Sequence, residues 1–227
     1  MVWCHAGPGS RLEAAGSAVA AQSLGLRLIG IDRPGYGLSS LRPGRTIADW
    51  VADGLAVVDA LGIGTFLTVG VSTGGAYALA IAALARDRVK GVVTACAMTD
   101  MRHRPAWDSM PGPTSHGIWN AVSREAALVI AADTFGEDGT KMMAGIAGLP
   151  AADIAFLTRP EYMAGAETGR AAMFANGVQA YADDRLADGP GWISFDVASV
   201  ACPVIIVHGE SDTIVPVLAA LAELARR

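Results

Sequence analysis

The chain has 227 residues, of which 52% are hydrophobic and 17% are charged. This composition excludes a disordered chain, which would be poor in apolar residues and rich in charge. The 17 Lys and Arg against 22 Asp and Glu give a net charge of −5. Because no basic stripe is present either, we expect no nucleic-acid partner.

The apolar runs and the cysteines bear on where the protein works. The longest apolar runs fall well short of the roughly 18 residues that a membrane span requires, and no export signal is visible. Three cysteines, Cys4, Cys96 and Cys202, lie in or beside apolar runs. That placement favours buried free thiols in a reducing compartment over disulfides or a zinc site. We therefore expect a cytoplasmic protein that needs no membrane, metal ion or cofactor.

Short apolar runs alternate with longer Ala- and Leu-rich segments, which is the pattern of a mostly parallel sheet flanked by helices. The strand candidates are nearly continuous in apolar residues because a parallel strand is covered on both faces. Strands are predicted at residues 1–5, 26–31, 66–71, 91–95 and 203–208. Helices are predicted at about residues 11–24, 46–61, 75–86 and 217–227.

The stretch between residues 97 and 203 breaks this alternation, because it contains no good strand. It carries helical patterns at residues 117–135, 151–157 and 161–186, the last opened by Pro160. A long loop without structure is improbable in a compact domain, so we predict a helical cap insertion over one end of the sheet. Its opening, residues 102–115, is expected to be irregular. The predicted division is a core of residues 1–98 and 191–227 and a cap of residues 99–190.

The segment from residue 66 to residue 80 carries the most chemical information. It contains GVSTG at residues 70–74, the G-x-S-x-G pattern in which a strand enters a helix through a tight turn. Such a turn exposes Ser72 at the carboxyl end of the sheet and aims the N–H of Thr73 at a developing oxyanion. The alternatives are a glycine-rich turn with an idle serine and a phosphate-binding loop. Neither a G-x-G-x-x-G pattern nor a Walker lysine follows, so we predict that Ser72 is a nucleophile.

A loop of small residues, CHAGPGS at residues 4–10, directly follows the first predicted strand. Such a loop can bring a second backbone N–H close to the serine, with Gly7 as the first candidate donor and Ala6 as the next. The alternative is an ordinary tight turn. We expect His5 to brace the loop rather than to transfer protons.

A candidate acid follows the last predicted strand, in the segment from residue 202 to residue 216. Its turn presents Asp212 beyond the carboxyl edge of the sheet, where an acid must lie to orient a histidine near Ser72. The alternative is an aspartate that stabilises its own turn. Asp100, just past the strand at residues 91–95, is the reserve candidate.

These three segments, together with GIDRPGYGLS at residues 30–39, closely resemble the α/β-hydrolase superfamily. The resemblance is to its small-molecule esterase, proline-iminopeptidase-like and C–C-bond hydrolase branches. Residues 5–9 (HAGPG) look like the H-G-G-P-G oxyanion loop of these branches, with Ala6 where glycine is usual. Residues 32–37 (DRPGYG) are similar to their D-x-x-G-x-G turn. The resemblance implies the α/β-hydrolase fold and a serine hydrolase.

The sequence departs from the family pattern at the catalytic base. The family order is serine, acid, histidine, and no histidine follows Asp212. Strands expected at both ends of the fold are also missing, which indicates a clipped reading frame or a naturally shortened paralogue. The four histidines of the chain are poor substitutes for the base: His5, His103, His116 and His208.

The first functional hypothesis is a carboxylesterase-like serine hydrolase that cleaves a small ester. Ser72 would attack the carbonyl, Asp212 would orient a histidine, and the N–H groups of the two donors would hold the oxyanion. A proline-iminopeptidase-like amide hydrolase is the alternative within this class.

The second hypothesis is a non-catalytic protein of the same fold, or an inactive truncated paralogue, that binds a small ligand. The missing histidine favours this hypothesis. A nucleotide-binding α/β protein is a third hypothesis, which only the glycine-rich turns support. Unpaired sheet edges would favour homo-oligomers in any of these cases.

Overall fold

A computed structural model describes the chain except for residues 99, 101–102, 111–116, 143–147, 190 and 218–227. Its centre is a parallel sheet of five strands in the order β2-β1-β3-β4-β6. The strands are β1 (Val2–Cys4), β2 (Ile29–Gly30), β3 (Phe66–Val71), β4 (Val89–Ala95) and β6 (Val204–Val207). All five overlap the predicted strands, and the predicted fold class, a parallel sheet flanked by helices, is confirmed.

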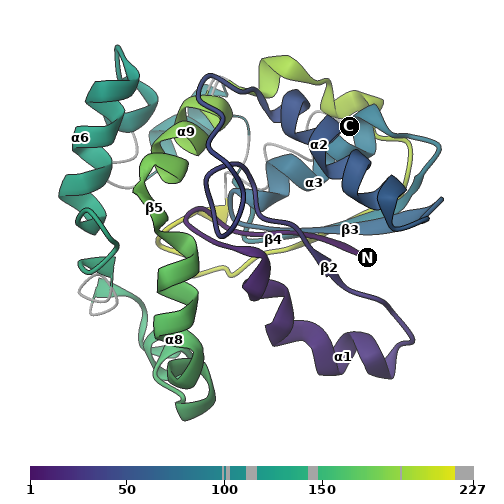
Figure 1. Ribbon diagram of the computed structural model, residues 1–227, viewed down its shortest axis with the longest axis horizontal. Helices are drawn as coiled ribbons and strands as arrows, with labels where there is room; N and C mark the ends of the chain where they lie inside the picture. Colours follow the sequence, from purple (N-terminus) through teal and green to yellow (C-terminus); the bar gives the residue numbers. More distant parts are fainter. Residues whose placement is uncertain (99, 101–102, 111–116, 143–147, 190, 218–227) are drawn as a thin grey trace.

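Helices cover both faces of the sheet (Figure 1). One face carries α2 (Ile47–Ala60) and α3 (Gly74–Leu84), and the other carries η1 (Arg11–Ser17) and α1 (Ala18–Ser23). Nearly every residue of α3 is buried, because its Ala and Gly side chains allow close packing between the sheet and α2. The short helices η3 (Gly191–Ser194) and η4 (Val197–Ser199) lead into β6.

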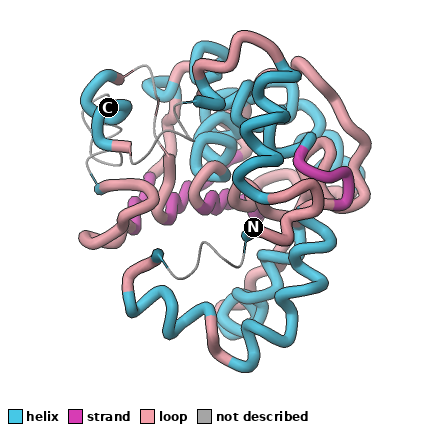
Figure 2. The backbone as a smooth tube through the Cα atoms, turned by 90° about the vertical axis from the view of Figure 1, so that its left-hand side faces the viewer, coloured by secondary structure: helices cyan, strands magenta, loops and turns pink. Residues whose placement is uncertain are grey.

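The segment between β4 and β6 is mostly helical and gathers at one end of the sheet (Figures 1 and 2). Its elements are α4 (Arg104–Ser109), α6 (Arg124–Phe135), α7 (Ala151–Leu157), α8 (Pro160–Met173), β5 (Ala175–Val178) and α9 (Gln179–Asp188). The domain boundaries predicted for this segment stay predictions, since residues 99 and 190 lie outside the described part of the chain.

Three predictions for this segment were wrong in detail. Residues 104–109 form a helix, which Pro105 can begin because the first turn needs no proline N–H. The predicted helix at residues 117–135 is interrupted, and α6 begins only after Ser123, whose hydroxyl caps it. The predicted helix at residues 161–186 is broken after Met173 by β5, where Gly177 takes a positive φ of 61°. Most of the predicted helix at residues 217–227 lies outside the described residues.

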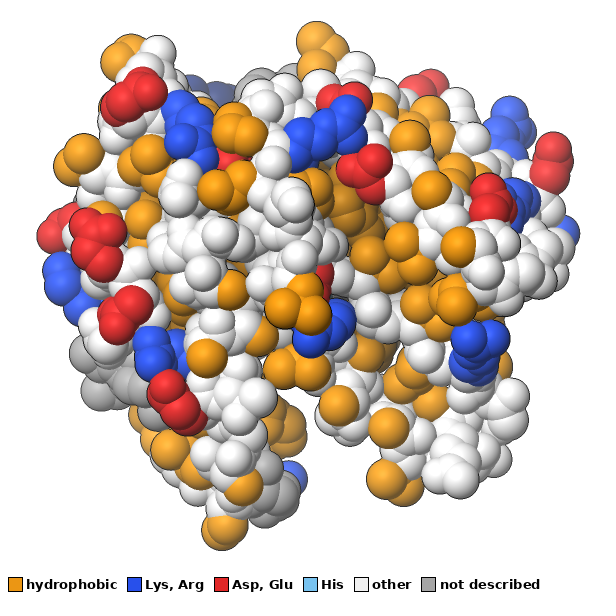
Figure 3. Space-filling model, in the orientation of Figure 1, with side chains coloured by type: hydrophobic (Ala, Val, Ile, Leu, Met, Phe, Trp, Pro, Cys, Tyr) orange, Lys and Arg blue, Asp and Glu red, His pale blue; other side chains and the backbone are white. Residues whose placement is uncertain are grey.

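The face shown in Figure 3 carries scattered charges of both signs among apolar and uncharged groups. The space-filling view is hollowed between the lobe that carries α8 and the lobe that carries α1. No helix in the described part of the chain is long and apolar enough to cross a membrane. The strands β2 and β6 are the edges of the sheet, and association through them stays a prediction.

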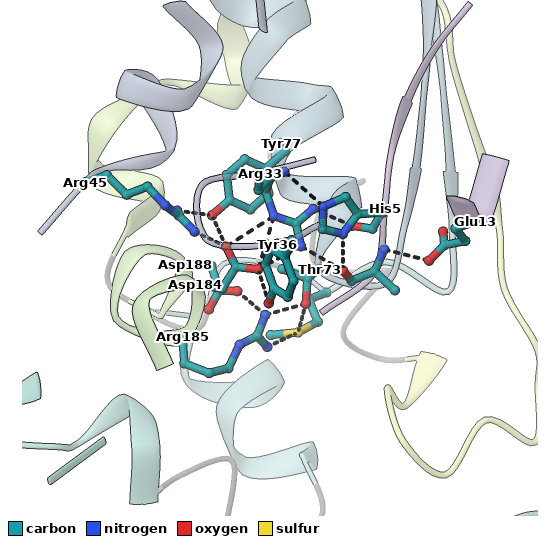
Figure 4. Close-up of polar contacts among 12 residues, drawn as sticks. His5, Glu13, Arg33, Tyr36, Arg45, Thr73, Tyr77, Asp184, Arg185 and Asp188 are labelled. Carbon is teal, nitrogen blue, oxygen red and sulfur yellow. Dashed lines mark hydrogen bonds and ion pairs between the residues drawn. The ribbon is translucent and has the colours of Figure 1, made fainter. Parts of the chain in front are cut away.

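A buried carboxylate joins α9 to the core (Figure 4). Asp184 of α9 accepts hydrogen bonds from Arg33, at 2.7 Å for Nη2, and forms an ion pair with Arg45. The side chains of all three residues are fully buried. The hydroxyls of Tyr36 and Tyr77 also donate to Asp184, at 2.9 and 3.1 Å. Burial raises the pKa of Asp184, but the two guanidinium groups outweigh it and hold that pKa well below its usual value.

Removal of this carboxylate should destabilise the protein strongly. In Asp184→Asn, Arg33 and Arg45 would remain buried without their counter-charge, and we expect a loss of about 3–5 kcal/mol in the free energy of unfolding. Urea denaturation measures this loss. Asp53→Asn is the matched control, because the side chains of Asp53 and its partner Arg42 are 52% and 46% exposed, and its loss should be about 1 kcal/mol or less. Equal losses in the two variants would contradict the role of Asp184 as the counter-charge of Arg33 and Arg45.

Candidate active site

Ser72 lies at the point where β3 passes directly into α3. It is a non-glycine residue with positive φ, 51°, a conformation that costs energy and concentrates at functional sites. Its N–H donates to the carbonyl of Ala95 at 2.9 Å, which continues the pairing with β4. Its own carbonyl accepts from Gly75 at 3.0 Å and from Met98 at 3.1 Å. The sharp turn predicted from the G-x-S-x-G pattern is therefore present, and its backbone is fixed by neighbours on three sides.

The glycines around Ser72 are required by close backbone contacts. A Cβ on Gly70 would lie 2.3 Å from the carbonyl oxygen of Gly74. A Cβ on Gly74 would lie 2.0 Å from the carbonyl oxygen of Cys4, and one on Gly75 would lie 2.3 Å from Cβ of Ala97. All three separations are shorter than real contacts. The turn therefore depends on missing side chains at each of these positions.

The loop at residues 5–9 reaches the same turn. A Cβ on Gly7 would lie 2.8 Å from Oγ1 of Thr73, so the two predicted oxyanion donors are neighbours. The N–H of Ala6, the second candidate, already donates to Glu13 Oε2 at 3.0 Å. Burial raises the pKa of Glu13, and its hydrogen bonds to Ala6 and to the Trp3 indole oppose this. The geometry thus favours Gly7 over Ala6.

His5 braces this loop, as predicted from its position. Its Nε2 accepts from the N–H of Arg33 at 3.1 Å, so its Nδ1 carries the proton and donates to the carbonyl of Ala6 at 2.7 Å. Burial, together with the charge of Arg33, lowers the pKa of His5 well below its usual value. A neutral imidazole with both nitrogens engaged cannot act as the base for Ser72.

Asp212 lies in the turn after β6, and most of its bonding is within that turn. Its Oδ1 accepts from the N–H groups of Ile214 and Val215, both at 2.9 Å. Its Oδ2 lies 3.5 Å from Nε2 of His208. That imidazole donates from Nε2 to the carbonyl of Val215 at 2.6 Å, so it is held in the turn as well. The structure therefore shows the turn-stabilising contacts, and an orienting role for Asp212 stays a prediction.

Cys96 lies between Ser72 and Asp212, because β4 lies between β3 and β6 in the sheet. It directly follows β4 with a positive φ of 41°, and its N–H donates to the carbonyl of Val207 at 2.8 Å. Burial and the charge of Asp212 raise the pKa of its thiol, while the N–H of Ser72 lowers it. The ends of β3, β4 and β6 thus bring Ser72, Cys96 and Asp212 to one edge of the sheet. The reserve acid Asp100 is only 1% exposed. Cys4, Cys96 and Cys202 are free thiols, and only Cys4 is fully buried.

Sequence reasoning missed a second charged pair at this site. Arg185 of α9 donates from Nη2 to the hydroxyl of Thr73 and from Nη1 to Sδ of Met98, the latter at 3.0 Å. It also forms an ion pair with Asp188, to which the indole of Trp119 donates at 3.0 Å. The consecutive charges at residues 183–185 were the available signal, because a helix covering an active site rarely buries charges without a partner.

Replacement of one glycine should show how closely the turn is packed. Gly74→Ala should lower the free energy of unfolding by about 3 kcal/mol or more, because its methyl group would displace the backbone of Cys4. Gly64→Ala is the matched control, since nothing lies within 4 Å of its Cβ, and its change should stay within about 0.5 kcal/mol. Urea denaturation measures both. Wild-type stability in Gly74→Ala would be inconsistent with this geometry.

Asp188 should give the stability a distinct pH dependence. Burial and the charge of Asp184 raise its pKa from 3.8 to about 6, although Arg185 and Trp119 act in the opposite direction. A raised pKa stabilises the folded state below pH 4, and this contribution is lost as the pH rises through 6. Wild type should therefore lose about 3 kcal/mol relative to Asp188→Asn between pH 4 and pH 7. Denaturation curves across this range measure the difference in the free energy of unfolding between the two proteins. A difference that does not change with pH would contradict the raised pKa of Asp188.

Comparisons with known proteins agree with the architecture. Among curated proteins none matches the chain. An esterase from Thermogutta terrifontis, solved with malate bound, superposes with a TM-score of 0.70 at 22% identity, over 99% of this chain and 76% of that one. The enol-lactonase from Burkholderia xenovorans gives a TM-score of 0.69 at 21% identity, over 99% and 77%. A meta-cleavage product hydrolase from Pseudomonas fluorescens gives 0.54 at 22%, over 99% and 78%.

Similarity at these identities concerns the fold alone. The family assignment comes from the profile of the alpha/beta hydrolase fold, which matches residues 1–227. The expected resemblance is thereby confirmed over the whole length of the chain: this protein belongs to the alpha/beta hydrolase fold family.

Proposed function

We propose that the protein is a serine hydrolase that acts on a small ester, with Ser72 as its nucleophile. The observation that carries this proposal is the positive φ of Ser72 at the strand-to-helix turn, within a ring of glycines that tolerate no Cβ. Such strain is maintained only where the surroundings impose it, and it projects the side chain away from the sheet. Family membership supports hydrolysis as the reaction class.

The reaction would follow the two steps of acyl transfer. Oγ of Ser72 forms a bond to the ester carbonyl carbon, and the carbonyl oxygen becomes an oxyanion held by the N–H groups of Thr73 and Gly7. The N-terminus of α3 adds its positive dipole end at Thr73. Collapse of this intermediate breaks the bond to the alcohol, which leaves with a proton. Water then attacks the acyl-serine, releases the carboxylic acid and restores the serine hydroxyl.

The hydroxyl of Ser72 must lose its proton to a base, and the contacts of each histidine limit which of them could accept it. Both ring nitrogens of His5 are engaged in its own loop. His208 donates from Nε2 to the carbonyl of Val215, whereas its Nδ1 is buried with no hydrogen-bond partner in the described structure. His116 lies outside the described residues. In the proposal, Asp212 orients an imidazole whose identity the activity test must reveal. The same observation favours a second candidate function, a ligand-binding protein of this fold without turnover, because a serine without a base is a weak nucleophile.

Two measurements test the proposal together. A fluorophosphonate probe should label wild type covalently, and short p-nitrophenyl esters should be cleaved at rates that Ser72→Ala lowers by at least about 10³-fold, as the loss of the nucleophile removes acyl transfer. Ser23→Ala is the control, because Ser23 is exposed at the end of α1. Labelling of Ser23→Ala should equal wild type.

The outcome separates the two candidates. No labelling and no turnover above water in wild type would reject the hydrolase and leave the ligand-binding protein. If turnover depends on Ser72, His103→Ala, His116→Ala and His208→Ala will identify the base. Release of p-nitroaniline from a prolyl anilide would place the activity with amide rather than ester hydrolysis.

A further inference from the structure

Arg185 reaches from α9 of the cap to the turn that carries the candidate nucleophile. Its side chain is only 4% exposed. A Cβ on Gly7 would lie 3.0 Å from its Nη2 and 2.8 Å from Oγ1 of Thr73. The guanidinium therefore lies against both residues proposed to bind the oxyanion, and Figure 4 shows it beside Thr73.

The donors of Arg185 are poorly satisfied for so buried a group. Nη1 faces the thioether of Met98, which is a weak acceptor, and Nε is buried with no hydrogen-bond partner in the described structure. A hydroxyl, from Thr73, and one carboxylate oxygen, from Asp188, are its stronger partners. A buried donor without an acceptor costs free energy, so the site retains capacity for a further acceptor.

The neighbouring Arg33 shows what a fully satisfied arginine looks like in the same cluster. Its Nε and Nη2 both donate to Asp184, and its Nη1 and Nη2 also donate to the carbonyls of His5 and Ala6. None of its nitrogens appears among the buried side-chain atoms without a partner in the described structure. The nitrogens of Arg33 are thus all satisfied by the protein, whereas Nε of Arg185, like Nε of Arg45, has no hydrogen-bond partner in the described structure.

The local charge also favours an anion. Three buried guanidinium groups, of Arg33, Arg45 and Arg185, form their ion pairs with two carboxylates, of Asp184 and Asp188. Glu13 lies on the other side of the 5–9 loop, where its oxygens are taken by Ala6 and Trp3. The N-terminus of α3, a helix of 11 residues, adds a positive dipole end at Thr73.

We propose that Arg185 forms an anion subsite beside the 5–9 loop, which takes a carboxylate carried by the acyl part of the substrate. The inference rests on the proposed ester hydrolysis at Ser72 and narrows its substrate class to monoesters of short dicarboxylic acids. The carboxylate would supply the missing acceptor for Nε and share Nη2, because Nε and Nη2 direct hydrogens to the same side of a guanidinium, as in the pair of Arg33 with Asp184. Two parallel N–H···O bonds of this kind are the favoured geometry between guanidinium and carboxylate.

Binding of glutarate tests the subsite without any turnover. Isothermal titration of wild type and Ser72→Ala should show binding, which Arg185→Gln should weaken by about ten- to hundred-fold, the range expected for charge-assisted hydrogen bonds. Arg185→Lys keeps the positive charge but loses the paired N–H donors of the guanidinium, so its affinity for glutarate should lie between those of wild type and Arg185→Gln. Arg104→Gln is the matched control, since the Arg104 side chain is 78% exposed on another cap helix, and its affinity should equal wild type.

Arg185→Gln leaves Asp188 buried without its cation, so its folding must be checked. Arg185→Gln/Asp188→Asn removes both charges and keeps the test valid if the single variant unfolds. Equal glutarate affinity in wild type and in either folded variant would overturn the proposal, as would the absence of binding to wild type at millimolar glutarate.

Ester hydrolysis provides a second test of the anion subsite. The ratio of kcat/KM for p-nitrophenyl hemiglutarate to that for p-nitrophenyl butyrate should exceed one in wild type and fall about ten- to hundred-fold in Arg185→Gln. Glutarate binding through Arg185 with no ester turnover would support the subsite and reject the hydrolase. Turnover of neutral esters, with an unchanged ratio and no glutarate binding, would support the hydrolase and overturn the subsite.

Discussion

The position of α9 depends on one buried carboxylate, and much of the site depends on α9. Asp184 is bound by two guanidinium groups from the core, Arg33 after β2 and Arg45 before α2. The hydroxyl of Tyr77, from α3, completes its shell. A buried ion pair of this kind contributes little net stability, but it strongly disfavours arrangements that leave its members unpaired. It therefore selects one placement of α9 over the sheet.

The same cluster also fixes the 5–9 loop. Arg33 binds the carbonyls of His5 and Ala6, and its own N–H binds the His5 imidazole. The side chain of Arg33 thus binds both the 5–9 loop beside Ser72 and helix α9. This coupling places Gly7, Thr73 and Arg185 against one another, although they come from a loop, a turn and α9.

Local patterns in the sequence predicted what local forces determine. β3 was predicted at its observed bounds because a continuous apolar run can be buried on both faces only as a central strand. The turn at Ser72 was predicted because a Gly–x–Ser–x–Gly pattern between strand and helix permits little else. The break at Gly177 was missed, because an Ala-rich helical pattern on both sides hides a single residue of positive φ.

Contacts between distant segments could not be predicted in this way. Arg33 and Asp184 are 151 positions apart, and no spacing rule connects them. The turn at Asp212 was predicted, but the engagement of its oxygens by Ile214 and Val215 depends on backbone directions. A motif was enough to propose Ser72 as the nucleophile. The contacts of Arg33, Asp184 and Arg185 around it could be found only in the structure.

The helices between β4 and β6 are attached unevenly, and this has a consequence for local opening. α9 is buried along most of its length, whereas α7 has no buried residue, and Phe156, Tyr162 and Met163 of the α7–α8 region are exposed. Few buried contacts mean a low free energy of local opening. Amide hydrogens of α7 should therefore exchange with solvent long before those of α9, so the region of α7 and α8 can open locally while α9 stays in place.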